Sequence, residues 1–536
     1  MTLNQHRLTQ KVGVWMINEG ARKIFFTLWT LVQSLIFGFG FVNYHLKDNL
    51  EGARRQFGLT YEIARASAFV LHFNVAFILL PVCRTFVSWL RRGPLDEMIP
   101  FEHSVSFHKT VAWSIMFWSL LHTAAHIVNA WKLGLSSSLQ LGGRVATLFK
   151  TLFTTGPAIT GWIMLTCLGV MVVNAVDRRQ RANFERFWCT HHLFIVLFIC
   201  WQVHGMFCFI KPDRPPYCSY KQIGVFWEYW LVGGVIYLGE RILREVRARQ
   251  HTYVNKVVCH PSSVVEVQIK KYGIKTRPGQ YIMINCPAIS YWQWHPFTLT
   301  SAPQDDFVSV HIRRIGDWTQ AFAAALGAST KSVTDNEEPG TTTSYPPLNT
   351  VMPRVMVDGP FGSVSEDVFD YEVSVLVGAG IGVTPFASVL KAVWHNFQNA
   401  RMGPDILRKV YLFWICRDYK AFEWFQSLLA AIEADDSIEI HMYMTGRVQL
   451  DEAVNIVTHD IGSEVDAVTK LRSPMHYGRP DWPSVFAKLV ETHPATQVGV
   501  FFCGPEPLGR VLRKHCNEFS AAQDDDTQFV YGKENF

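Results

Sequence analysis

The stretch FHKTVAWSIMFWSLLHTAAHIVN, residues 107–129, decides how the first half of this chain folds. It is long enough to cross a bilayer core, which needs about 20 helical residues, yet it carries His108, His122 and His126. His108 and His122 are 14 residues apart. In a helix this separates them by about 21 Å along the axis and leaves them within roughly 40° of one face. Imidazole is costly in hydrocarbon without a partner, so these side chains are candidates for a functional site.

A second apolar stretch, residues 187–209, repeats this pattern with His191, His192 and His204. His191 and His204 lie 13 residues apart, roughly 20 Å in a helix, although a straight helix would point them about 140° from each other. A bulge or kink would correct that angle, and His192 could replace His191 on spacing alone. Two helices with histidines at paired depths can hold two b-type haems in series, each iron between two axial imidazoles. The predicted metal ligands are His108 with His191, and His122 with His204. Histidines bonded to helix carbonyls, or a proton channel, are the alternatives.

Four further apolar stretches complete a predicted set of six membrane spans. The spans are Ile24–His45, Ile63–Trp89, Phe107–Asn129, Ala158–Val176, Phe187–Phe209 and Ile223–Leu238. Basic clusters fall at alternate membrane ends, which predicts that these ends are cytosolic. No small-residue cleavage site follows the first span, so we expect a retained anchor and not a signal peptide. A soluble protein with long core helices is the alternative.

The composition of the 536-residue chain excludes several classes of protein. Apolar residues make up 49% and charged residues 18%, which excludes disorder for the bulk of the chain. The excess of 50 basic over 45 acidic residues is small, and no basic patch indicates a nucleic-acid partner. The 11 cysteines include no CxxC pair and no CxxCH motif, which argues against a zinc site and covalent haem. Cys208 and Cys218 fall in a segment predicted to lie outside, where a disulfide can persist; two free thiols are the alternative.

The second half of the chain changes character after Arg249. Alternating apolar residues in Val264–Ile269 and Val308–Ile312 predict strands of an antiparallel barrel. From about Val355, strands alternate with helices. The apolar strand Val373–Val377 leads into Gly378-Ala379-Gly380-Ile381-Gly382-Val383-Thr384-Pro385, where glycines let backbone amides approach a pyrophosphate at a helix N-terminus. A tight connection is the plain alternative.

The next predicted strand, Val410–Ile415, bears on the choice of nucleotide. It ends in Cys416-Arg417 and lacks the acidic residue that holds a ribose 2′-hydroxyl in a typical NAD site. Arg417 suits a 2′-phosphate instead, which favours NADPH. The alternative is a solvated surface arginine.

Two motifs in the barrel region carry a family resemblance. The run Trp294-His295-Pro296-Phe297-Thr298-Leu299-Thr300 is followed by Arg313-Arg314-Ile315-Gly316-Asp317-Trp318-Thr319. These segments resemble the ferredoxin–NADP reductase superfamily, and together with the paired histidines the chain resembles the NADPH oxidases over nearly its whole length. The resemblance implies a multi-domain chain with a six-helix transmembrane bundle carrying two haems at 1–245, an antiparallel β-barrel FAD domain at 246–354, and a Rossmann-like α/β NADPH domain at 355–536.

The same resemblance assigns residues to the cofactors. It implies that His295, Pro296, Phe297 and Thr298 line the flavin. Arg313 with Gly316, Asp317, Trp318 and Thr319 would meet the FAD pyrophosphate, a dianion that needs an arginine fork and backbone donors. The residues expected to face NADPH are Gly378, Gly380, Gly382, Thr384, Pro385, Cys416, Arg417, Arg479, Cys503 and Gly504. Phe536 would cover the flavin ring where the nicotinamide enters; a frayed terminus is the alternative.

The resemblance also implies an activity. Cytosolic NADPH would pass hydride to FAD, and single electrons would then cross the two haems to O₂ outside, giving superoxide. Arg65 and His126 resemble oxygen-site residues, since a cation stabilises a forming anion; for Arg65, pairing with haem propionates is the alternative. A metalloreductase using the same relay is the closest rival function, and a non-enzymatic channel or scaffold is a more distant one.

Partners are implied only by resemblance. They are a small membrane adaptor, a cytosolic activator and a Rac-type GTPase. No EF-hand loop pattern occurs in the sequence, so we do not expect direct calcium control. The plasma membrane and internal membranes are both compatible with the sequence.

Overall fold

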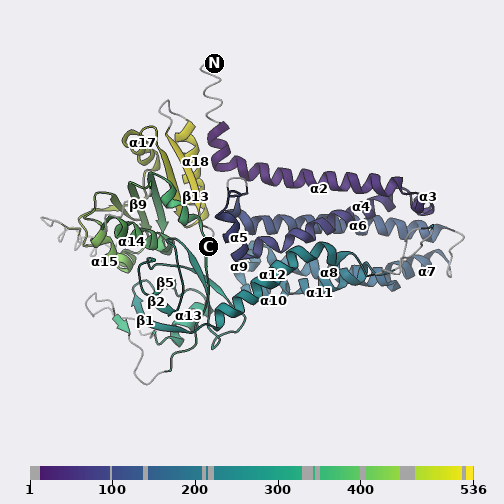
Figure 1. Ribbon diagram of the computed structural model, residues 1–536, viewed down its shortest axis with the longest axis horizontal. Helices are drawn as coiled ribbons and strands as arrows, with labels where there is room; N and C mark the ends of the chain where they lie inside the picture. Colours follow the sequence, from purple (N-terminus) through teal and green to yellow (C-terminus); the bar gives the residue numbers. More distant parts are fainter. Residues whose placement is uncertain are drawn as a thin grey trace, which may run out of the picture. The chain divides into compact units, whose positions relative to one another are not determined.

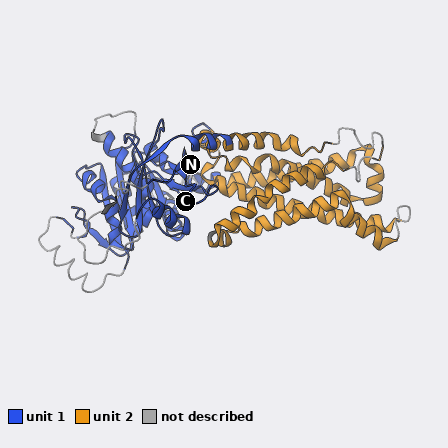
Figure 2. Ribbon diagram, turned by 90° about the horizontal axis from the view of Figure 1, so that it is seen from below, with its two compact units in different colours: residues 1–21, 91–94, 242–536 blue, residues 22–90, 95–241 orange. Residues whose placement is uncertain are grey.

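A computed structural model gives the fold of two compact units (Figure 2). It describes residues 12–96, 99–136, 143–207, 213–214, 223–328, 342–344, 351–398, 406–446, 465–466, 468–521 and 527–534. The helical unit comprises Arg22–Leu90 and Leu95–Arg241. The sheet unit comprises Met1–Ala21, Arg91–Pro94 and Ile242–Phe536.

The helical unit is built from long helices that run side by side (Figure 1). The long elements are α2 (Ala21–Leu46), α4 (Leu59–Ile78), α6 (Ser104–Leu135), α8 (Gly156–Ala175), α10 (Phe184–His191), α11 (Leu193–His204) and α12 (Phe226–Arg249). Within the part of the chain that the structure describes, five helical segments are long and apolar enough to cross a membrane: Asn18–Leu46, Leu59–Val82, Phe101–Leu135, Gly156–Ala175 and Phe184–His204. Large apolar side chains such as Leu35 and Phe39 of α2 are exposed, as expected for a surface that faces lipid.

Two predicted spans differ from the structure in instructive ways. The second was expected to run to Trp89, but the apolar segment ends at Val82, because Pro81 in the short helix η3 (Leu80–Val82) cannot continue α4. Residues up to Trp89 belong instead to α5 (Arg84–Arg91). The predicted sixth span corresponds to α12, which is not among the five apolar segments. This helix carries charged residues, among them Glu228, Glu240 and Arg241.

Antiparallel strands make up the first part of the sheet unit. One sheet has the order β4-β3-β7 and the other β5-β2-β1-β6. Their strands are β1 (Thr252–His260), β2 (Val264–Lys271), β3 (Tyr281–Asn285), β4 (His295–Thr298), β5 (Val308–Arg313), β6 (Thr342–Ser344) and β7 (Met356–Phe361). Apolar residues from these strands and from α13 (Asp317–Ala325) form one buried cluster. The two predicted strands begin at Val264 and Val308, as the alternation indicated.

The second part of the sheet unit is a six-stranded parallel sheet. Its order is β11-β10-β9-β8-β12-β13, with β8 (Val373–Ala379), β9 (Lys409–Cys416), β10 (Ile438–Met444), β11 (Met475–Tyr477), β12 (Gln497–Cys503) and β13 (Gln528–Lys533). Helices α14 (Thr384–Gln398) and α15 (Gln426–Ile432) pack on one face. Helices α17 (Trp482–Thr492) and α18 (Glu506–Ala521) pack on the other. The strand order reverses between β8 and β12, and open parallel sheets bind ligands at such a switch point.

Candidate functional site

Four of the membrane histidines form two facing pairs in the helical unit. The ring centroids of His108 and His191 are 6.1 Å apart, and those of His122 and His204 are 6.3 Å apart. A metal–imidazole bond is about 2 Å long, so two imidazoles on opposite sides of one iron place their centroids roughly 6 Å apart. The separation of the two rings in each pair therefore fits one iron.

Hydrogen bonds orient three of these rings. His108 Nδ1 lies 2.8 Å from the Ile78 carbonyl oxygen, and His122 Nδ1 lies 2.8 Å from the Ala64 carbonyl oxygen. Both acceptors belong to α4. His204 Nδ1 lies 2.9 Å from Thr160 Oγ1 of α8. Metal-bound histidines usually make such a bond through the nitrogen that does not touch the metal, so Nε2 of each ring is left for an iron.

The choice between His191 and His192 follows from a break in the helix. Helix α10 ends at His191 and α11 begins at Leu193, so the ideal 100° step does not apply across this point. His192 Nδ1 bonds the carbonyl of Trp188 in the preceding helix α10 at 2.7 Å, whereas His191 faces His108. Nδ1 of His191 is buried and makes no hydrogen bond to any residue that the structure describes. The geometry favours His191 as the ligand candidate.

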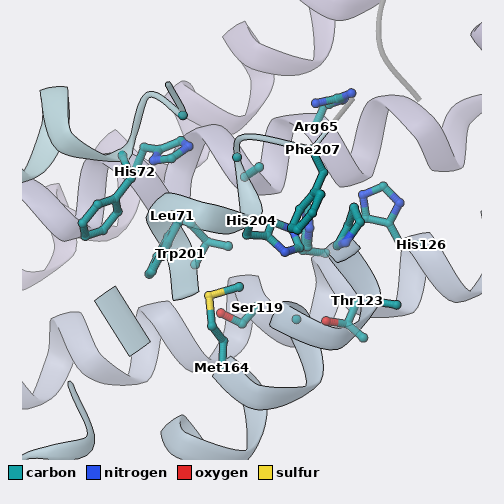
Figure 3. A pocket seen from close by; sticks show the side chains of 18 of the residues that line it. Arg65, Leu71, His72, Ser119, Thr123, His126, Met164, Trp201, His204 and Phe207 are labelled. Atoms are coloured by element: carbon teal, nitrogen blue, oxygen red, sulfur yellow. The ribbon is translucent and has the colours of Figure 1, made fainter. Parts of the chain in front are cut away.

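A cavity of about 840 Å³ surrounds the His122 and His204 pair. Arg65 and His126 line it too, and Figure 3 shows both side chains near His204. The His126 ring lies 4.6 Å from that of His122, edge to face. The Arg65 guanidinium lies 5.4 Å from the centre of the Tyr61 ring. The helical unit thus places a cation and a further imidazole beside one predicted haem position, and the size of the cavity suits a large planar ligand.

The residues predicted to face the nucleotide gather along one edge of the parallel sheet. Because all six strands run the same way, the segments that follow their carboxyl ends share that edge. Gly378 pairs in register with Cys503 of the neighbouring strand. The other members follow β8, β9, β11 and β12: Gly380, Gly382, Thr384, Pro385, Arg417, Arg479 and Gly504. Widely separated segments are therefore brought to one place.

Two glycines of the first turn are required by geometry. Gly380 has φ +58°, a conformation that side chains disfavour. A Cβ on Gly382 would lie 2.3 Å from the Cys503 carbonyl oxygen, so only glycine allows this contact. Burial raises the pKa of the Cys416 and Cys503 thiols, which keeps both as neutral thiols at neutral pH.

Arg417 is exposed directly after β9. The next residue, Asp418, makes hydrogen bonds to other groups of the protein. Asp418 Oδ2 accepts a hydrogen bond from Ser262 Oγ at 2.5 Å, and Asp418 Oδ1 accepts one from the Lys420 amide at 3.0 Å. Both oxygens of the Asp418 carboxylate thus already accept hydrogen bonds from protein groups. The exposed Arg417 at this point suits a nucleotide whose 2′ position carries a phosphate.

The predicted flavin motif is packed against the glycine-rich turn. Thr298 Oγ1 of β4 donates to Thr384 Oγ1, the first residue of α14, at 2.6 Å, and both residues are buried. His295 stacks on Trp318 with ring centroids 4.1 Å apart, and Phe297 lies 6.1 Å from the same ring. Burial lowers the pKa of His295 to about 4, so it is neutral at physiological pH. Trp318 is itself buried and supports His295 from the core side.

The predicted pyrophosphate residues lie at the start of α13. Arg313 ends β5 and is exposed, and Gly316 is the residue that precedes the helix. Thr319 Oγ1 accepts hydrogen bonds from the amides of Ile315 and Gly316, which fixes the turn. An arginine beside a helix N-terminus is suited to an anionic group.

Some predictions fall outside the described residues. Phe536, Cys208 and Cys218 do so, and the role of Phe536 and the state of the two thiols stay predictions. Close to the terminus, Glu534 is buried and accepts hydrogen bonds from Ser363 Oγ, the Ser365 amide and Ser365 Oγ at 2.6–2.7 Å.

Comparison with known proteins assigns the family. Residues 71–201 match the ferric reductase like transmembrane component, residues 249–365 an FAD-binding domain, and residues 371–517 the ferric reductase NAD binding domain. The chain is 36% identical to NADPH oxidase 1 of Mus musculus over 98% of this chain and 95% of that protein. It is 36% identical to NADPH oxidase 3 of Homo sapiens over 98% of this chain and 100% of that protein. It is 35% identical to a superoxide-generating NADPH oxidase heavy chain of Dictyostelium discoideum, over 98% of this chain and 99% of that protein.

The chain belongs to the NADPH oxidase family. Its three matched regions correspond to a transmembrane domain, which carries haems in NADPH oxidases, and to FAD- and NADPH-binding domains. The family resemblance found in the sequence is confirmed.

A further histidine of this NADPH oxidase was not predicted from the sequence. His72 of α4 also lines the cavity, and its ring stacks on Tyr229 at 4.8 Å. The signal that could have found it is the one used for the other histidines, an imidazole within an apolar span.

Proposed function

We propose that this chain is a multi-pass membrane NADPH oxidase that moves electrons from NADPH through FAD and two b-type haems to O₂ and releases superoxide. The family membership supports this activity. The observation that carries the electron path is the pair of histidine couples, 6.1 and 6.3 Å between ring centroids, whose bonded Nδ1 atoms leave Nε2 for a metal at three of the four rings.

In this proposal, His108 and His191 hold one haem, and His122 and His204 hold the other. FAD and the haems supply the conversion of a two-electron hydride donor into single-electron transfer. His295, Pro296, Phe297 and Thr298 line the flavin, and Arg313 with Gly316, Asp317, Trp318 and Thr319 holds or supports its pyrophosphate end. Arg417 and Arg479 bind phosphate groups of NADPH, and Phe536 covers the flavin.

The residues beside the outer histidine pair act on the acceptor. If His122 and His204 both bound one iron, they would leave O₂ to react beside the haem and not on the metal. Arg65 and His126 line the adjoining cavity, where a positive charge in a medium of low dielectric stabilises a superoxide anion as it forms. These two residues therefore mark the proposed oxygen site.

The arrangement in the membrane is part of the proposal. The basic residues Arg84, Arg91 and Arg92, and then Arg178, Arg179 and Arg186, mark the cytosolic ends. Helix α12 serves as a sixth span, and the dehydrogenase half lies in the cytosol. The domains are 1–245, 246–354, as a β-barrel, and 355–536. A small membrane adaptor, a cytosolic activator and a Rac-type GTPase are the proposed partners, by resemblance to phagocyte-type oxidases.

The experiment that tests the function uses the full chain in lipid vesicles. NADPH is added on the side of the sheet unit, and reduction of a superoxide probe, oxygen consumption and ferric reduction are followed with and without superoxide dismutase. We expect oxygen consumption and probe reduction that the dismutase abolishes. Ferric reduction that persists undiminished without oxygen consumption would identify a metalloreductase instead.

A further inference from the structure

A cluster of three potential metal ligands lies in the sheet unit, apart from every residue assigned above to flavin, nucleotide or haem. His260 is the last residue of β1, Glu266 lies in β2, and His311 lies in β5. Glu266 and His311 are direct cross-strand partners. One ligand atom from each of the three side chains lies within 4.8 Å of the other two. Paired strands thus bring the imidazole of His311 beside His260 and Glu266, two residues that lie close together earlier in the sequence.

The polar atoms of this cluster are buried without adequate partners. His260 is 9% exposed and His311 is 7% exposed. Within the described part of the chain, neither ring nitrogen of His260, nor Nε2 of His311, makes a hydrogen bond. His260 Nε2 lies 3.5 Å from Glu266 Oε2, which is longer than the usual range of roughly 2.7–3.2 Å. Unpaired polar atoms in such a position are destabilising, and a bound cation would remove the deficit.

Neighbouring side chains hold the atoms that would not touch the metal. His311 Nδ1 is 3.0 Å from Thr300 Oγ1. Gln268 Nε2 donates to Glu266 Oε1 at 2.9 Å. Outer contacts of this kind orient metal ligands. They leave His311 Nε2, Glu266 Oε2 and one nitrogen of His260 available to a shared ion.

The protonation states also suit a metal. Burial lowers the pKa of His311 to about 3. Burial acts to raise the pKa of Glu266, but the adjacent His260, His311 and Gln268 side chains outweigh it and lower that pKa to about 2. At neutral pH the cluster therefore offers a neutral imidazole and a carboxylate, which are the forms that bind metals.

We propose that His260, Glu266 and His311 bind a divalent transition metal ion, with zinc as the ion that this ligand set suits best. Two imidazoles and one carboxylate are a recurrent zinc ligand set, and three protein ligands leave the fourth position for water. The inference does not depend on the proposed oxidase activity.

The location of the site indicates what the metal does. The His311 ring lies 4.5 Å from that of Phe425, in η9 (Tyr419–Phe425), which follows β9 in the parallel-sheet region. Trp424 Nε1 donates to the Pro261 carbonyl at 2.9 Å, one residue after His260. A metal at this point braces the turn between β1 and β2 against η9. Its role is to stabilise the contact between the antiparallel strands and the nucleotide-binding sheet.

Metal analysis of the purified full chain tests the proposal. The protein is stripped with EDTA, dialysed against a small excess of Zn²⁺, freed of loose metal on a desalting column, and assayed for zinc and flavin by mass spectrometry and absorbance. We expect about one zinc per chain in the native protein. His311→Ala and Glu266→Gln should each weaken zinc binding at least tenfold, since each removes one of three ligands.

His441→Ala is the matched control. His441 Nε2 lies 3.0 Å from Glu439 Oε1, so this pair has the same ligand types, but no third ligand joins it among the described residues. Its zinc content should equal that of the native chain. Flavin content in every variant shows whether the sheet unit is folded.

X-ray absorption at the zinc edge of the native chain gives a readout that does not require a variant. A first shell of nitrogen and oxygen at about 2.0–2.2 Å, with imidazole scattering beyond it, is expected. A native chain with less than about a tenth of an equivalent of zinc would overturn the site. So would zinc that stays unchanged in both ligand variants, or a shell that contains sulfur.

Discussion

The helical unit and the sheet unit present their functional residues in different ways. In the helical unit, each predicted haem site rests on two side chains, and the same imidazoles are visible in the sequence because ionisable groups are rare in apolar spans. In the sheet unit, the predicted nucleotide site draws on segments after several strands, and outside the glycine-rich turn after β8 its residues carry no distinctive signal. Topology, more than residue type, makes that second site visible.

This contrast has an energetic consequence. Removing one of two axial ligands takes half of the protein's bonds to a metal, whereas removing one phosphate contact leaves the backbone amides and the other arginine in place. Single substitutions of the paired histidines should therefore abolish function, whereas single substitutions at the phosphate contacts of the sheet unit should weaken it.

The largest effect is expected for His122→Ala. The substitution removes one of the two histidines proposed to hold the second haem, so the purified chain should carry one haem per polypeptide, and superoxide output should fall by roughly 100-fold or more, beyond the roughly 10- to 100-fold cost of losing only an outer contact to a metal ligand. Reduced-minus-oxidised spectra with haem counting measure the first effect. His192→Ala is the matched control because His192 bonds the Trp188 carbonyl, and it should keep both haems. If His122→Ala retained two haems, the expected difference between the two units in their sensitivity to single substitutions would be wrong.

Arg65→Ala should have a smaller effect that sharpens the assignment of the oxygen site. If the guanidinium stabilises superoxide as it forms, output falls by roughly tenfold or more, as for a lost electrostatic group at a reacting anion, while both haem bands remain. Arg65→Lys keeps the charge and should restore part of the rate. Loss of a haem band in Arg65→Ala would instead give the arginine a structural role at a haem propionate.

Arg417→Ala tests the distributed site in the sheet unit. Loss of a charged contact of about 1.5–3 kcal/mol should raise KM for NADPH by roughly 10- to 100-fold, with kcat and the KM for NADH little changed. Steady-state kinetics with both nucleotides provide the measurement. The control is Arg408→Ala, at the opposite end of the same strand and paired with Glu372 at 3.7 Å. Equal losses with NADPH and NADH would show that Arg417 does not read the 2′-phosphate.

The sequence was most informative where a physical rule left few options. The spacing of His108 and His122 predicts their stacking on one helix, and the alternation in Val264–Ile269 predicts a strand, because helix and strand geometry are periodic. It could not decide between His191 and His192, since the break between α10 and α11 is set by tertiary packing. Nor could it show that the Asp418 carboxylate accepts a hydrogen bond from Ser262, a residue 156 positions away in the chain.

The smallest predicted effect tests whether the burial cost that makes membrane histidines conspicuous also operates in the sheet unit. Lys271 of β2 is 8% exposed, and its Nζ donates to the carbonyls of Val357 at 2.6 Å and Arg247 at 3.1 Å. Burial lowers the pKa of this ammonium group from 10.5 to about 8, although Asp358 opposes the shift. The folded chain therefore holds this proton less tightly than the unfolded chain. The stabilising contribution is present above about pH 10.5 and is lost as the pH falls through 8.

Lys271→Met should remove this pH dependence. Between pH 8 and pH 10, Lys271 should add on the order of 1–2 kcal/mol to the free energy of unfolding of the sheet unit, so over this interval the native chain should gain that much stability relative to the variant. The temperature at which FAD is released, followed by flavin fluorescence, reports the stability of this unit at each pH. Lys270→Met is the control, because the neighbouring Lys270 is exposed and pairs with Asp306 at 2.7 Å; its profile should match the native one. An identical pH dependence of stability in all three proteins would mean that Lys271 keeps an ordinary pKa. Burying a charged group in the sheet unit would then cost less than burying one in the membrane.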